Sequence, residues 1–300
     1  MSRRLSRIAA VNAQIIAEGE YTAHDGTVVA VGPALAAAVS GTVSHPPDEP
    51  IDVPDTATAH RTLFEVTAEG SLQAARRLHL AGTERIAVLN FASARNPGGG
   101  YLGGAKAQEE DLCRGTLLYP CLLQAPDYYD AHRASSDLLY SDHVIWSPDV
   151  PVHRDDDGRL LPGPYQVSFL TCPAPNAGQV LRRDPDAGER IRRVLHRRAG
   201  RVLAVAAQHG ARRLVLGAWG CGVFRNDPRE VAEAFHVHLT EGGAYSTAFE
   251  RVVFAVWDRS PDSVNRAAFA DRFASVSLPV AGRQADEPTY GDMREKEMRQ

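Results

Sequence analysis

Two adjacent carboxyl side chains behind a run of glycines are the residues best suited to chemistry in this sequence. Five glycines occupy seven positions from Gly98 to Gly104, and Gln108, Glu109 and Glu110 follow shortly after. Glycines let the backbone pass close to a ligand, and free N–H groups in such a loop suit an anion such as a phosphate. Burial and a neighbouring carboxylate both favour a protonated carboxyl near neutral pH, so the pair suits general acid–base catalysis.

Each half of this segment has an ordinary explanation when it is taken alone. A glycine run can be a flexible loop, and acids in the first turn of a helix favour the positive end of its dipole. Here the two stand together, directly after the apolar run Arg85–Phe91, which predicts a buried strand. Because ligands in open α/β sheets bind at the C-terminal ends of strands, we predict an anion-binding catalytic site at this point.

A second glycine-rich loop follows another apolar run. Gly217, Gly220 and Gly222 come directly after Arg213–Leu216. The loop lacks the lysine of a Walker A motif and does not match G-x-G-x-x-G. Two such loops at strand ends of one sheet predict a long ligand with a diphosphate in its middle. Phe224, just past the glycines, is expected to stack on a ribose or base, with plain core packing as the alternative.

Alternating strands and helices surround these loops. The sequence predicts strands at 62–66, 85–91, 143–146, 165–171, 213–216 and 251–257, and helices at 69–80, 108–123, 185–208, 228–239 and 262–273. This alternation predicts an α/β sandwich around a central sheet. We expect residues 61–276 to form this main domain, and the polar residues 277–300 to be a flexible tail.

The first sixty residues are expected to be an N-terminal extension that packs on the main domain. Apolar residues at helical spacing predict an amphipathic helix that ends near Gly19, and Asn12 and Gln14 interrupt the apolar stretch that a signal peptide needs. Asp25-Gly26 between two β-rich runs predicts a hairpin, and a short helix is expected at 33–39. Residues 40–60 hold four prolines and predict a surface loop.

Composition limits the possible partners. Hydrophobic residues make up 44% of the 300-residue chain, but no apolar run approaches the roughly 18 residues of a membrane span. The four cysteines match no zinc template, so we expect free thiols in a reducing cytoplasm, with no metal and no cofactor. The net charge is −4 and the arginines are spread among acids, so we expect no direct nucleic-acid binding.

The glycine and carboxyl segment resembles a known family. Gly98-Gly99-Gly100, seven intervening residues and Gln108-Glu109-Glu110 are similar to the GGG-x(6–8)-QEE signature of bacterial-type poly(ADP-ribose) glycohydrolases. The resemblance covers roughly residues 1–275, with support from the segments 90–93, 172–178 and 220–224. It implies a macrodomain-like fold, which is a three-layer α/β/α sandwich around a mixed sheet. It also implies metal-independent hydrolysis of the ribose–ribose O-glycosidic bonds of poly(ADP-ribose), which releases ADP-ribose.

The resemblance further implies roles for individual residues. Glu110 is expected to be the catalytic acid, and Glu109 to hold hydroxyls of the two riboses around the scissile bond. Gly98, Gly99 and Gly100 are expected to lie against the terminal ribose and the diphosphate. The remaining expected substrate contacts are Asn90, Gln108, Gly217, Gly220, Cys221, Gly222, Val223 and Phe224, of which the last six would hold the diphosphate and the adenosine ribose.

The chemistry of the bond agrees with a single acid. Cleavage of a ribosyl acetal passes through an oxocarbenium-like transition state, and its leaving hydroxyl must be protonated. Ordinary retaining glycosidases place two carboxyls on opposite sides of the bond, which adjacent residues do not easily do. We expect a monomer acting on poly(ADP-ribose) or an ADP-ribosylated protein. Two alternatives stay open: a hydrolase of another ADP-ribosyl bond, to a protein side chain or a nucleobase, and a non-catalytic ADP-ribose-binding macrodomain, which would not need the carboxyls.

Overall fold

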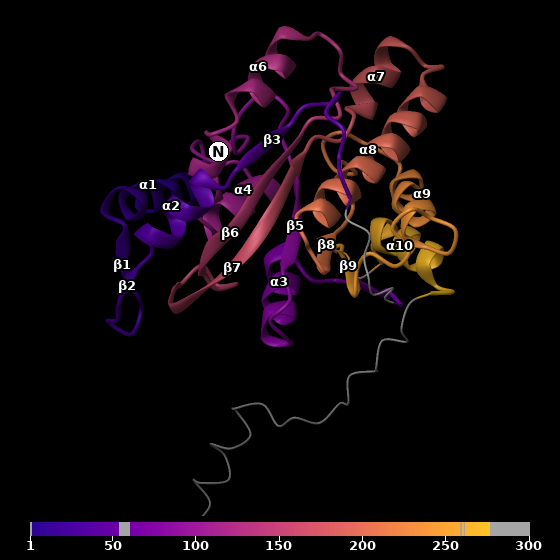
Figure 1. The fold of residues 1–300 in the computed structure, drawn as a ribbon. Helices are drawn as coiled ribbons and strands as arrows, with labels where there is room; N and C mark the ends of the chain where they lie inside the picture. The colour runs from indigo at the N-terminus through magenta and orange to yellow at the C-terminus, as the bar shows by residue number, and fades with distance from the viewer. Residues whose placement is uncertain (1, 54–60, 259, 261, 277–300) are drawn as a thin grey trace, which may run out of the picture.

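A seven-stranded mixed sheet forms the middle of the protein (Figure 1). The structure is a computed structural model that describes residues 2–53, 61–258, 260 and 262–276. The predicted tail at 277–300 and part of the loop predicted at 40–60 lie outside these residues. The strands of the sheet, in spatial order, are β3 (Val43–His45), β6 (Val144–Arg154), β7 (Leu160–Cys172), β5 (Ile86–Phe91), β8 (Arg213–Leu216), β9 (Arg251–Ala255) and β4 (Leu63–Thr67).

Five neighbouring strands of the sheet, β7, β5, β8, β9 and β4, run parallel to one another, and β5 lies second among them. This strand runs parallel to β7 on one side and to β8 on the other, and β8, β9 and β4 continue in the same direction. β6 is antiparallel to both β7 and β3. The C-terminal ends of β7, β5 and β8 therefore meet at one edge of the sheet.

Side chains alternate along the strands and so belong to two separate cores, one on each face of the sheet. In β5, Ile86 and Val88 belong to one core, whereas Ala87 and Leu89 belong to the other. The first core is covered by α1 (Arg3–Glu18), α2 (Gly32–Ser40), α3 (Ser71–Leu80), α4 (Gln108–Gly115), α5 (Leu118–Leu122) and α6 (Pro126–Ala134). The second is covered by α7 (Ala177–Arg183), α8 (Gly188–Gln208), α9 (Pro228–Leu239) and α10 (Val264–Phe273).

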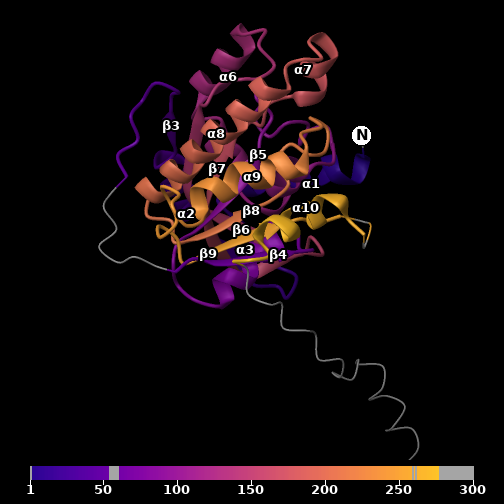
Figure 2. The same cartoon turned by 90° about the vertical axis from the view of Figure 1, so that its right-hand side faces the viewer.

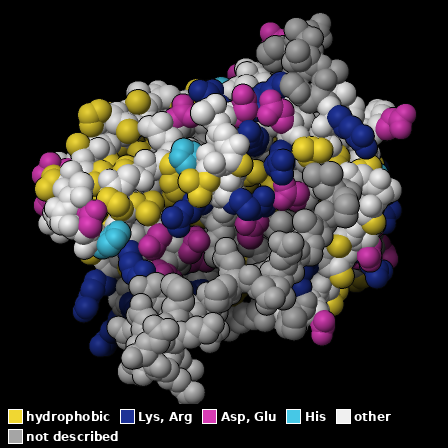
Figure 3. All heavy atoms as spheres, turned by 90° about the horizontal axis from the view of Figure 1, so that it is seen from below, with side chains coloured by type: hydrophobic (Ala, Val, Ile, Leu, Met, Phe, Trp, Pro, Cys, Tyr) yellow, Lys and Arg dark blue, Asp and Glu magenta, His cyan; other side chains and the backbone are white. Residues whose placement is uncertain are grey.

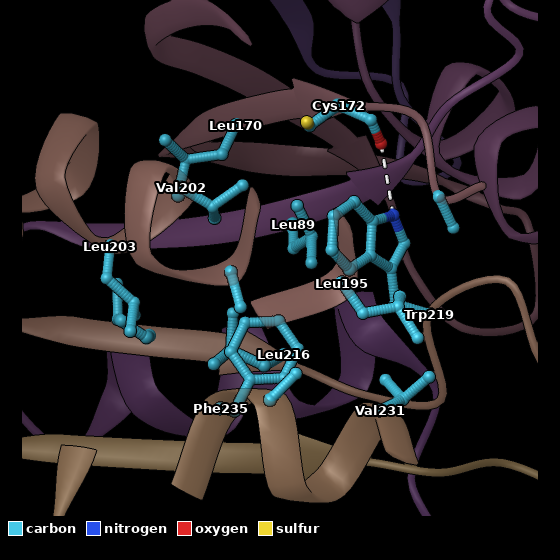
Figure 4. Close-up of a cluster of buried hydrophobic side chains, with 14 of the residues drawn as sticks. Leu89, Leu170, Cys172, Leu195, Val202, Leu203, Leu216, Trp219, Val231 and Phe235 are labelled. Carbon is cyan, nitrogen blue, oxygen red and sulfur yellow. Dashed lines mark hydrogen bonds between the residues drawn. The ribbon is translucent and has the colours of Figure 1, made fainter. Parts of the chain in front are cut away.

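Helices on both faces of a mixed sheet confirm the predicted three-layer α/β/α sandwich. Figure 2 faces the second helical layer, with α8, α9 and α10 in front of the sheet. Within this layer the buried Trp219 lies among aliphatic side chains, and its indole Nε1 donates a hydrogen bond of 3.1 Å to the main-chain oxygen of Cys172 (Figure 4). That bond joins the segment after β8 to the end of β7. None of the described helices is long and apolar enough to cross a membrane.

The N-terminal elements follow the sequence prediction in part. α1 ends at Gly19, whose φ of 72° terminates the helix. The predicted hairpin forms from β1 (Glu20–Thr22) and β2 (Val28–Ala30), but Thr22 pairs with Val28, so its loop is longer than a two-residue turn. The prediction of a surface loop at 40–60 is wrong in part. β3 lies within this stretch and pairs with β6 as an edge strand of the main sheet.

Other differences fall on the helices around the sheet. The single helix predicted at 108–123 is two helices, because the backbone of Thr116 bridges to Val152 in β6 and Leu117 N–H donates to the oxygen of Pro151 at 3.0 Å. α6 and α7 were not predicted. α7 begins where the Asn176 side chain accepts a hydrogen bond from the N–H of Gln179.

Candidate active site

Three chain segments leave the sheet at the same edge. Phe91 at the end of β5 pairs with Cys172 at the end of β7, and Val88 pairs with Val215 near the end of β8. The first glycine-rich loop follows β5 and the second follows β8, so the fold brings the two predicted loops together. This is the edge at which ligands bind in open α/β sheets.

Glu109 is buried between the end of β5 and the start of the first loop. Its Oε2 accepts a 2.7 Å hydrogen bond from the N–H of Ser93, and its Oε1 accepts one of 3.3 Å from Asn90 Nδ2. Asn90 is two positions beyond Val88, so strand alternation turns its amide toward the layer that contains α4. The amide also donates to Thr171 Oγ1 at 3.1 Å, which fixes its orientation from β7.

Glu110 is held by the glycine loop itself. Its Oε1 accepts a 2.8 Å hydrogen bond from the N–H of Gly100. A Cβ at Gly99, whose φ is +58°, would lie 2.5 Å from that oxygen and 3.0 Å from Glu109 Oε2. The two carboxyl oxygens are therefore separated by no more than the sum of these distances. Glu110 Oε2 is buried and has no hydrogen-bond partner among the described residues.

Gln108 joins the helix start to the strand. Its Oε1 accepts from the N–H of Phe91 at 2.8 Å, and its Nε2 donates to the oxygen of Leu89 at 2.8 Å and to Ser71 Oγ at 3.1 Å. Both ends of the amide thus have partners within the protein. In this arrangement Gln108 fixes the first turn of α4, and with it the two carboxyls, against the end of β5.

The surroundings of Glu109 favour its protonated form. Burial is the main cause that raises the pKa of Glu109 to about 8, and the charge of Glu110 adds to it, whereas the Ser93 N–H and the Asn90 amide oppose the rise. Near neutral pH Glu109 therefore retains a proton.

The second loop combines packed glycines with an open rim. A Cβ at Gly220, whose φ is +72°, would lie 2.4 Å from the Cβ of Ala174, and one at Gly217 would lie 2.6 Å from the oxygen of Ala255. Gly222 has no atom within 4 Å of the corresponding position, and Val223 is 84% exposed. The loop is therefore anchored at its base, and its tip is accessible to a ligand.

Phe224 lies between the core and an aromatic neighbour that sequence reasoning missed. Its half-buried ring packs against the second core, and its centroid is 5.9 Å from that of Tyr140. The main-chain oxygen of Tyr140 accepts a hydrogen bond of 3.1 Å from Nη2 of the fully buried Arg198. No local signal marks Tyr140, because the contact joins positions far apart in the sequence. Burial raises the pKa of Cys221, in the same loop, to about 12, so its thiol stays protonated at neutral pH.

The described residues bring together no group of three or more His, Cys, Asp or Glu side chains that could hold a metal ion. What the site offers is a buried carboxyl pair, one amide, backbone N–H groups and an aromatic pair. These groups can donate and accept protons and bind a ligand that carries both an anion and a ring.

Comparison with known proteins gives consistent matches. The family model of the microbial-type PARG catalytic domain matches residues 9–155. The structure is similar to poly(ADP-ribose) glycohydrolase from Thermomonospora curvata, with 49% identity, a TM-score of 0.85 and coverage of 91% of this chain and 100% of that chain. The structure of the same protein bound to the inhibitor ADP-HPD matches with 48% identity, a TM-score of 0.83 and the same coverage. Poly(ADP-ribose) glycohydrolase from Deinococcus radiodurans in complex with ADP-ribose matches with 47% identity and a TM-score of 0.76. The match covers 82% of this chain and 99% of that chain. No curated protein matches the chain.

Proposed function

The chain belongs to the microbial-type poly(ADP-ribose) glycohydrolases, and from that premise we propose how its carboxyl pair performs the hydrolysis. The observation that carries the proposal is the environment of Glu110. One of its oxygens is fixed by the N–H of Gly100, and the other is buried without a partner among the described residues. A carboxyl held in this way has one oxygen available for proton transfer.

Glu110 is the general acid in this proposal. It donates its proton to the ribose oxygen that leaves, as the C–O bond breaks and positive charge develops on the other ribose. The resulting carboxylate then accepts a proton from the water that attacks the oxocarbenium-like carbon. Glu109 and Glu110 are neighbours in the first turn of α4, and both contact the glycine loop. This placement supports catalysis by one acid rather than by two carboxyls on opposite sides of the bond.

In this proposal the proton that Glu109 holds in the free site passes to Glu110 when substrate binds. Ribose hydroxyls that donate to Glu109 favour its ionised form, because donated hydrogen bonds stabilise the charge of a carboxylate. Substrate binding would then leave the proton of the pair on Glu110, at the atom that needs it. The raised pKa of Glu109, to about 8, supports this mechanism because Glu109 then holds a proton near neutral pH.

The two loops divide the binding of substrate. We assign the terminal ribose and part of the diphosphate to Gly98–Gly100, and the diphosphate and adenosine ribose to the loop from Gly217 to Phe224. The exposed tip at Gly222 and Val223 supports this, because backbone N–H groups there can approach a phosphate. The ring of Phe224, with Tyr140 beside it, supports stacking on the base.

The partner is a polymer of ADP-ribose, free or attached to a protein, and we place the reaction in a reducing cytoplasm. The four free cysteines support that compartment. Basic and acidic side chains lie interspersed on the face shown in Figure 3, and together with the net charge of −4 this favours our expectation of no direct nucleic-acid binding.

The function is tested by incubating the purified chain with labelled poly(ADP-ribose) in a buffer that contains EDTA. We expect ADP-ribose as the product, and no product from Glu110→Gln under the same conditions. A parallel reaction uses a protein that carries single ADP-ribose units. Release from that substrate alone would support the alternative ADP-ribosyl hydrolase, and turnover that EDTA stops and Mg²⁺ or Zn²⁺ restores would contradict the metal-independent mechanism.

A further inference from the structure

A buried amide on α1 contacts the helix that carries the carboxyl pair. Asn12 is 1% exposed, and its Nδ2 donates to the main-chain oxygens of Cys113 at 3.2 Å and Arg114 at 3.0 Å. Both oxygens belong to the last turn of α4, where carbonyls have no partner within the helix. Asn12 therefore supplies both of its amide hydrogens to the C-terminal end of α4.

The other side of the same amide is fixed by β6. Asn12 Oδ1 accepts hydrogen bonds from His153 Nε2 at 3.0 Å and from Arg154 Nη2 at 2.9 Å. Burial lowers the pKa of His153 to about 3, so its ring is neutral at physiological pH and its hydrogen must lie on Nε2 to make this bond. The amide thus has only one favourable orientation, with its donors toward α4 and its acceptor toward β6.

α1 also touches the first glycine loop. The N–H of Ser2 donates to the oxygen of Gly104 at 3.1 Å, and a Cβ at Gly104 would lie 2.4 Å from the oxygen of Ser2. Arg114, whose oxygen Asn12 binds, donates from Nη1 to the oxygen of Ala105 at 2.9 Å. The N-terminal helix therefore contacts both parts of the structure that place the carboxyls, namely the loop and the end of α4.

We propose that Asn12 is a positioning residue for the reaction, because its amide fixes the end of α4 and thereby the place of Glu109 and Glu110. The inference rests on the proposed function of this pair. α4 is eight residues long. Glu110 and Arg114 are separated by one turn, about 6 Å along the axis. A shift at the end of so short a helix moves the carboxyls with it, and small displacements of catalytic groups lower the rate strongly.

Asn12→Asp is the most direct test. Aspartate has the same shape and keeps the acceptor that faces His153 and Arg154, but it has no hydrogen to donate to α4. We expect kcat on poly(ADP-ribose) to fall at least about tenfold, whereas KM and the Kd of ADP-ribose stay within about twofold, because the second loop is untouched. Asn12→Ser, which adds no charge, should show the same division between kcat and KM and so separates the lost donors from the new charge.

Ile15→Val is the structural control, since Ile15 is a buried residue of α1 that packs in the first core. It should lower Tm and leave kcat unchanged. The inference is contradicted if folded Asn12→Asp keeps the kcat of the wild type, or if Ile15→Val reproduces the loss of kcat at an equal loss of Tm. Failure of both Asn12 variants to fold would assign Asn12 to folding and also contradict it. If Glu110→Gln retains turnover, the proposed role of Glu110 is wrong, whatever the Asn12 variants do.

Discussion

The two glycine-rich loops follow neighbouring strands, yet their glycines serve different neighbours. In the first loop the space that a Cβ would need is filled by the protein, with Tyr119 3.0 Å from the position at Gly98 and Glu110 2.5 Å from that at Gly99. In the second loop Gly220 is packed equally closely, but Gly222 faces open space. Glycine in the first loop admits the protein's own carboxyls, whereas at the tip of the second it leaves room for a ligand. The carboxyl pair is thus packed against the first loop, and the tip of the second loop stays exposed.

Among the substitutions in the two loops, Gly99→Ala should have the largest effect. Its Cβ would displace the Glu110 carboxyl, and we expect kcat to fall at least about 100-fold. Gly158→Ala is the matched control, because Gly158 has a φ of +83° but no atom within 4 Å of the added carbon. Both variants carry similar backbone strain, so steady-state kinetics beside melting curves isolate the clash. Equal kcat values for the two variants would contradict the account.

The buried carboxyl should make stability depend on pH. The folded pKa of Glu109, about 8, lies above its usual value of 4.5, so between these values the folded state binds more protons than the unfolded state. Its contribution to stability is therefore present at low pH and is lost as pH rises. Between about pH 6 and about pH 7.5 the free energy of unfolding should fall by about 2 kcal/mol from this group.

Denaturant unfolding of the wild type and of Glu109→Gln at the two pH values measures this contribution. The glutamine variant lacks the titrating group and should lose the corresponding part of the slope. An identical fall in both proteins would show that Glu109 does not carry the proton. This pH dependence would belong to the first loop, because the carboxyl of Glu109 packs beside that loop and not beside the second.

Phe224→Ala should act on binding rather than on the chemical step. Loss of stacking on a base costs about 1–3 kcal/mol, which corresponds to a Kd for ADP-ribose raised by about 5- to 150-fold. The ring also packs against the second core, so Phe224→Leu is a useful companion that retains apolar packing without the flat face. Calorimetry should show weakened binding in both variants. An unchanged Kd in both would remove Phe224 from the binding site.

Gly222→Val should give the smallest effect. The open surroundings of Gly222 accommodate a larger side chain, so Tm should stay the same. The added methyl groups would hinder a phosphate that approaches the backbone N–H groups, and we expect the Kd of ADP-ribose to rise by less than about tenfold. A lower Tm with unchanged affinity would show that the residue is structural.

The sequence was sufficient for those features that depend on neighbouring residues. The apolar run of β5, the glycines after it and the acids that open α4 are contiguous, so their order alone predicted a strand, a loop and a helix that meet at one site. The continuous apolar run also predicted that this strand is buried, which the structure confirms. The same reasoning predicted Glu109 and Glu110 as neighbours but could not show which oxygen the Gly100 N–H would hold.

Features that depend on distant contacts were missed. The helix predicted at 108–123 is broken because Thr116 pairs with Val152 in another strand. β3 is three residues long within a proline-rich stretch, and it exists because β6 offers it an edge. Asn12 was noted only as an interruption of an apolar run, since its partners in α4 and β6 are brought to it by the fold.

Single-turnover hydrolysis by Glu110→Gln, with the Kd of ADP-ribose measured on the same protein, tests the central claim most directly. Glutamine keeps the size of the side chain and can still accept from Gly100, but it has no acidic proton to donate. We expect the rate of bond cleavage to fall by at least about 10²- to 10⁴-fold, while ADP-ribose affinity and Tm stay close to those of the wild type. A folded Glu110→Gln protein that cleaves poly(ADP-ribose) at nearly the native rate would contradict it.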